Sequence, residues 1–68
     1  MINPQLQQAI QSEVAQCQEE GQDADDIKFM SIGAGIRFGR EQGVIGDPVE
    51  PEMQAAIQAV VEQELKKG

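Results

Sequence analysis

The chain has 68 residues, with 12 acidic and 5 basic side chains, no histidine and a net charge of −7 at pH 7. A chain this short forms one small domain and is marginally stable without a disulfide, a metal or a partner. The single cysteine, Cys17, excludes an internal disulfide, and the lack of histidine excludes Cys/His zinc sites. Association remains as a source of stability, so we expect a homo-oligomer, most simply a dimer.

The acidic charge also restricts the class of partner. Residues 1–26 hold six acids and no base, and such a surface repels nucleic acid and anionic membranes. No apolar stretch approaches the roughly 20 residues of a membrane span, and the N-terminus lacks the pattern of a signal peptide. A lone cysteine suits a reducing compartment. We therefore expect a cytoplasmic protein without direct nucleic-acid or membrane binding.

The first predicted element is a helix over residues 4–20. Asn3 suits the N-cap, Pro4 suits the first helical position, and Gly21 suits the stop. One apolar stripe follows the helical repeat: Leu6, Ile10, Val14 and Cys17. Asp23 or Asp25 can then cap a second helix.

The stretch "MSIGAGIRFGREQG", residues 30–43, is ambiguous because it holds four glycines. Residues 27–39 are similar to the glycine fingerprint of Rossmann-type proteins, but no second strand follows to complete that site. A β-hairpin is a second interpretation, in which "GAG" makes the turn and two helices cover one face. The third interpretation, a helix over residues 25–42, agrees best with the spacing of the small residues.

In that helix the small residues repeat every four positions and form one stripe: Ser31, Gly35, Gly39 and Gly43. Each helical glycine costs about 1 kcal/mol relative to alanine, so we expect a neighbour packed closely on the stripe. The apolar residues fall on two sides, and we expect both sides to be buried, between the other helices or in a dimer. One side holds Ile27, Met30, Ala34 and Phe38; the other holds Phe29, Ile32 and Ile36.

The last predicted element is a helix over residues 50–66. Pro51 fits its first turn, and Lys66 and Lys67 lie where a helix C-terminus favours cations. Its apolar face consists of Met53, Ile57, Val60, Val61 and Leu65. The predicted fold is therefore all-α, a small three-helix bundle with a glycine-striped central helix. The alternative is an α+β fold with a central hairpin between two helices.

Catalysis is not expected, because the chain has no histidine, tyrosine or tryptophan. Cys17 lies on an apolar stripe without a base nearby, which favours a small buried side chain over a nucleophile. We expect no cofactor and no metal. The prediction is a non-enzymatic, acidic regulator or inhibitor that binds a protein partner.

Size and composition alone make this chain similar to small inhibitors of bacterial defence that phages and mobile elements encode. The alternative function is binding of a small molecule or nucleotide by Lys28, Arg37 and Arg40. The predicted partner or ligand surface comprises these three cations with the apolar residues Phe29, Ile32 and Ile36.

Overall fold

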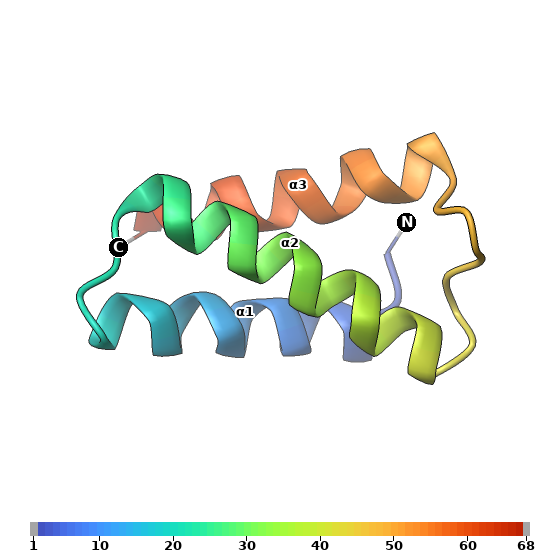
Figure 1. Ribbon diagram of the computed structural model, residues 1–68, viewed down its shortest axis with the longest axis horizontal. Coiled ribbons are helices and arrows are strands. Elements are labelled where there is room, and N and C mark those ends of the chain that lie inside the picture. Colours follow the sequence, from blue (N-terminus) through green and yellow to red (C-terminus); the bar gives the residue numbers. More distant parts are fainter. Residues whose placement is uncertain (1, 68) are drawn as a thin grey trace.

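The computed structural model describes residues 2–67, which form three helices: α1 (Pro4–Glu19), α2 (Ala24–Glu41) and α3 (Pro51–Lys67). Each helix contacts the other two. The chain runs up, down and up, so that α2 lies antiparallel to α1 and α3 (Figure 1). The all-α three-helix prediction is confirmed, and the hairpin alternative is wrong, since residues 27–39 are helical.

Helix α1 begins where the sequence indicates. The Asn3 side-chain oxygen accepts hydrogen bonds from the N–H groups of Gln5, at 2.8 Å, and Leu6, at 3.3 Å. These two bonds satisfy N–H groups that have no partner within the helix. Asp23 stands at the N-cap position of α2 but makes no side-chain capping bond, and Asp25 lies inside the first turn. The capping role predicted for these aspartates is therefore not realised.

Helices α1 and α2 end in the same way. Gly21 and Gly43 follow the two helices with φ of 78° and 74°, a conformation that glycine adopts without strain. Beyond α2, the Val44 N–H donates to the Gly39 carbonyl at 2.9 Å, and the Gly43 N–H donates to the Arg40 carbonyl at 3.1 Å. This pair of bonds is a Schellman motif, which satisfies the last carbonyls of the helix.

The core lies between the three helices and is closed at one end by the α2–α3 loop. Its buried apolar residues are Leu6, Ile10, Val14, Cys17, Ile27, Ile45, Ile57, Val60 and Val61. Met53 and Leu65 pack against this core from α3. Among residues 2–67, no helix combines the length and the apolar character needed to cross a membrane.

Helix α2 turns its smallest side chains toward the core. Ser31, Gly35 and Gly39 are buried. A β-carbon added to Gly35 would lie 2.9 Å from Ile10 Cγ1, and one added to Gly39 would overlap Ile45. The lack of side chains at these glycines therefore allows α1 and the α2–α3 loop to approach α2 closely. Gly43 takes no part in this packing, contrary to the prediction, because it lies beyond the helix with no atom near its missing β-carbon.

Candidate functional site

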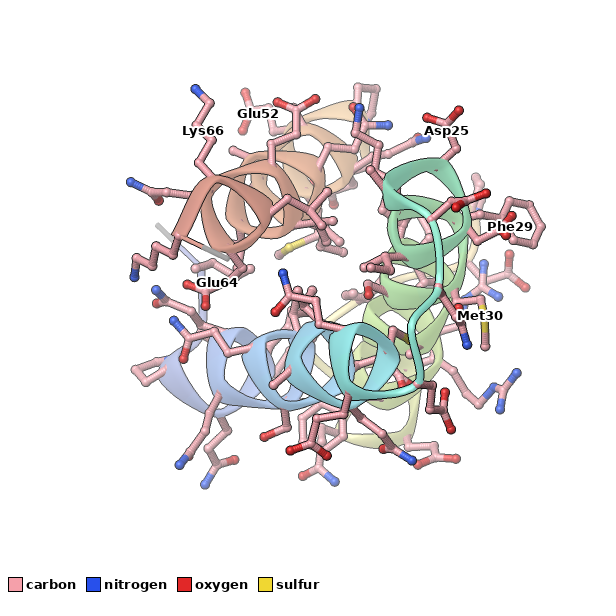
Figure 2. All side chains as sticks on the ribbon, turned by 90° about the vertical axis from the view of Figure 1, so that its left-hand side faces the viewer. Asp25, Phe29, Met30, Glu52, Glu64 and Lys66 are labelled. Atoms are coloured by element: carbon pink, nitrogen blue, oxygen red, sulfur yellow. The ribbon has the colours of Figure 1, made fainter. Side chains whose placement is uncertain are left out.

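The outer face of α2 carries the most exposed large apolar side chains of the described chain. Phe29 is 83% exposed and Met30 is 46% exposed. Viewed along the bundle, both side chains point away from α1 and α3 (Figure 2). Within one chain, α1 and α3 therefore do not bury these residues, and their burial in a dimer stays a prediction. The helix has more apolar positions than its two neighbours can cover.

A shallow hollow of about 250 Å³ lies on this face, where α2 meets α1. It is lined by Glu13, Phe29, Met30, Gly33, Ala34 and Arg37. Gly33 is exposed, and no atom lies within 4 Å of the position that its β-carbon would occupy. The hollow therefore combines an aromatic ring, a thioether, bare helix backbone and one charge of each sign.

Charged residues continue the outer face in both directions. Asp26 lies in the first turn of α2, and Arg40 lies in its last turn. Arg37 is exposed, and no ion pair involving it occurs within residues 2–67. Arg40 forms an exposed ion pair with Asp47, with 3.3 Å between the guanidinium and carboxylate groups. The outer face of α2 is consequently acidic at its start, apolar in the middle and basic at its end.

The remaining predicted surface residues lie elsewhere on α2. Lys28 pairs with Glu62 of α3 at 3.6 Å, in an exposed contact. Ile32 and Lys28 line a second, smaller hollow of about 180 Å³ with Gln58 and Glu62 of α3. Ile36 is half-buried against the core.

The six predicted surface residues are therefore divided among four places: the outer hollow, the hollow beside α3, the α2–α3 loop and the edge of the core. Only Phe29 and Arg37 share the outer hollow, whereas Lys28 faces α3 and Arg40 pairs with the α2–α3 loop. The three cations named for anion binding do not converge on one point. A phosphate group would need several of them together to be held by charge-assisted hydrogen bonds.

The sequence pattern does not assign five residues of this surface: Glu13, Asp26, Met30, Gly33 and Ala34. One signal was available, because Gly33 lies off the four-residue stripe of small residues and so has no packing role in that pattern. The apolar pattern groups Met30 with Ile27 on one side of α2. Ile27 is buried, but Met30 lies at the edge of that side and is exposed. Glu13 lies on α1, and only the packing of α1 against α2 brings it to the hollow.

Cys17 is 1% exposed in the core. Burial raises the pKa of its thiol, and the carboxylates of Glu13 and Glu20 raise it further. A protonated, buried thiol is a poor nucleophile. Ser31 is also buried, and its hydroxyl oxygen makes no hydrogen bond within residues 2–67.

The described chain brings no group of three or more cysteine, aspartate or glutamate side chains into a position to hold a metal ion. Comparison with protein families, with curated proteins and with solved structures found no match for this chain. Function must therefore be argued from the surface itself.

Proposed function

We propose that this protein is a non-enzymatic regulator or inhibitor that acts by binding a protein partner through the outer face of α2. The observation that carries the proposal is Phe29, an aromatic side chain that is 83% exposed beside Met30 and bare helix backbone at Gly33. Exposure of an aromatic ring to water is unfavourable in proportion to its apolar area, and a bound partner would remove that area from water.

The side chains of this face are those that protein interfaces favour. Aromatic residues, methionine and arginine are enriched at interfaces, and energetically dominant positions are often aromatic or arginine. Phe29, Met30 and Arg37 meet at one hollow. The molecule as a whole is acidic, with a net charge of −7. Among partners other than this chain itself, one with a basic rim around an apolar centre is therefore the best match to the net charge.

The proposal can be tested by capture from a cell lysate with the immobilised protein. The wild type should retain a protein in stoichiometric amount, and Phe29→Glu should lose it. Gln63→Glu is the matched control, because it makes the same change of charge at an exposed position on α3, and it should retain the partner. An inhibitor of bacterial defence encoded by a phage or mobile element falls within this proposal, so bacterial lysates are the first choice.

Two results would contradict the proposal. The first is equal capture by the wild type and Phe29→Glu, which would place binding on another surface. The second is a rise in the melting temperature on addition of nucleotides that Arg37→Ala abolishes, which would favour the anion-binding alternative.

A further inference from the structure

We propose that, in the purified protein, a second copy of this chain occupies the outer face of α2, with the two α2 helices antiparallel and crossing at Gly33. This inference rests on the proposed function, because it names a protein that binds the same surface. Three features carry it: the bare backbone at Gly33, the exposed apolar residues beside it, and the order of charges along the helix.

Gly33 is the first feature. A glycine inside a helix is less favourable than alanine, so each one calls for a reason. Gly35 and Gly39 have theirs, because Ile10 and Ile45 fill the space where side chains would be. Nothing within the described bundle uses the space at Gly33. A second helix would use it, since a small residue lets two helix backbones approach closely.

The apolar pair beside Gly33 is the second feature. Phe29 and Met30 precede it by about one helical turn and are the exposed large apolar side chains of the described chain. In an antiparallel pair that crosses at Gly33, Phe29 and Met30 of both copies lie within about one helical turn of the crossing point. Each copy then covers apolar area of the other, which is favourable in proportion to that area.

The charges are the third feature, and they are arranged symmetrically about Gly33. Asp26 lies seven residues before Gly33 and Arg40 lies seven residues after it, about 10.5 Å away in each direction along the helix. Phe29 and Arg37 lie four residues before and after. In an antiparallel pair, positions equally far from the crossing face each other. Asp26 therefore faces the partner's Arg40, and Phe29 faces the partner's Arg37.

The same order of charges disfavours a parallel pair in register. Seven residues make almost two full helical turns, so Asp26, Gly33 and Arg40 lie along one stripe of α2. A parallel pair in register would set Asp26 against the partner's Asp26 and Arg40 against the partner's Arg40. Like charges at both ends oppose that arrangement, whereas the antiparallel arrangement places opposite charges at both ends.

The geometry of the end contacts favours a shallow crossing. At 10.5 Å from the crossing point, helices inclined by about 20° are displaced sideways by about 4 Å, and helices inclined by about 50° by about 9 Å. An arginine side chain spans the smaller displacement. The present contact of Arg40 with Asp47 does not prevent this, because both side chains are exposed and such pairs hold weakly.

A standard interface buries about 800 Å² on each partner, roughly one-sixth of the 4653 Å² accessible surface of this chain. The outer face of α2, with the neighbouring edge of α1 that contributes Glu13 to the hollow, lies open for such a contact.

Charge exchange at the two ends tests the arrangement. Sedimentation equilibrium of the wild type from micromolar to millimolar concentration should show a mass rising toward twice the monomer mass of 7.4 kDa. Asp26→Arg and Arg40→Asp should each raise the dissociation constant about tenfold, since each sets like charges at both ends. An equimolar mixture of the two variants should recover wild-type affinity as a heterodimer, and the double variant should recover it as a homodimer.

A second variant tests the crossing point. Gly33→Gln adds a polar side chain at a position where the monomer has room. We expect this variant to fold more stably as a monomer and to weaken the dimer about tenfold or more, because the side chain separates the helix backbones. Ala59→Gln, at an exposed position on α3, is the control and should leave dimerisation unchanged. Circular dichroism establishes that each variant is helical.

Three results would overturn the inference. One is a mass that stays at the monomer value at every concentration. Another is a dimer that the single charge exchanges do not weaken, or that neither the mixture nor the double variant restores. The third is a dimer that Gly33→Gln leaves unchanged. If the purified protein is monomeric and the Phe29-dependent capture from lysate persists, the proposed function stands and the second copy is excluded as the occupant.

Discussion

Replacing Gly39 with alanine should destabilise this protein, although alanine is the better helix former by about 1 kcal/mol. The added β-carbon would overlap Cδ1 and Cγ1 of Ile45 and would lie in tight contact with the Ile45 β-carbon, at 3.2 Å. Ile45 has little freedom to withdraw, because its N–H donates to the Gly39 carbonyl at 3.2 Å and its side chain is 7% exposed.

The size of this destabilisation follows from the apolar burial that Ile45 loses. Expelling a buried isoleucine forfeits about 1.5–3 kcal/mol of burial. After the gain of about 1 kcal/mol in helix propensity, the net loss is about 0.5–2 kcal/mol. That is a large part of the roughly 3–5 kcal/mol that a core of this size supplies. Gly39→Leu should therefore leave little folded protein.

Two other glycines of the same helix are matched comparisons. At Gly35, the new β-carbon would meet Ile10 Cγ1 at 2.9 Å and Ile57 Cγ2 at 3.4 Å. Crowding of about 1 kcal/mol or more then offsets the gain in helix propensity, so Gly35→Ala should be neutral or mildly destabilising. Gly33→Ala meets no atom within 4 Å and should stabilise the monomer by about 0.5–1 kcal/mol.

Urea denaturation followed by circular dichroism would measure the three variants, at a concentration low enough for each to be monomeric. The expected order of midpoints is Gly33→Ala, wild type, Gly35→Ala and Gly39→Ala, from highest to lowest. A midpoint for Gly39→Ala equal to or above that of the wild type would refute the close packing of the α2–α3 loop on α2.

Three further predictions concern the helix cap and the two buried side chains that could carry chemistry. In the same urea assay, Asn3→Ala should lower the free energy of unfolding by about 1 kcal/mol, because Asn3 caps two N–H groups. Asp23 makes no capping bond, so Asp23→Ala should change the free energy of unfolding by less than about 0.5 kcal/mol. Ser31→Ala should raise the urea midpoint, since it removes a buried hydroxyl without a partner in the described chain. A lower midpoint would show that the Ser31 hydroxyl makes a stabilising hydrogen bond. The pKa of Cys17 is raised above 9.0 in the folded protein, so at alkaline pH the folded state retains a proton that the unfolded state loses. The free energy of unfolding should therefore be constant below about pH 9 and decline as the pH rises above it. Cys17→Ala should show a smaller decline at alkaline pH, and an unchanged decline in this variant would assign the effect to other groups.

Local sequence signals were sufficient for the helices. The ends of α1 depend on Asn3, Pro4 and Gly21, whose effects act within one turn of the chain. The predicted bounds of all three helices lie within one residue of those observed. Gly43 was predicted both as a stop and as a packing residue, and its φ of 74° beyond the end of α2 leaves only the first role.

The stripe of small residues predicts which side of α2 packs closely, but which apolar residues of α2 stay exposed was decided only by tertiary structure. Apolar residues surround most of this helix, so its periodicity does not indicate which of them face the core. The answer depends on how closely α1 and the α2–α3 loop can approach, and that depends on the side chains of Ile10 and Ile45, which fill the space at Gly35 and Gly39. Once those contacts turn the small residues inward, Phe29 and Met30 are left facing solvent. Phe29 and Arg37 of the candidate surface were predicted from the sequence, whereas the positions of Met30, Gly33 and Glu13 beside them depend on long-range packing.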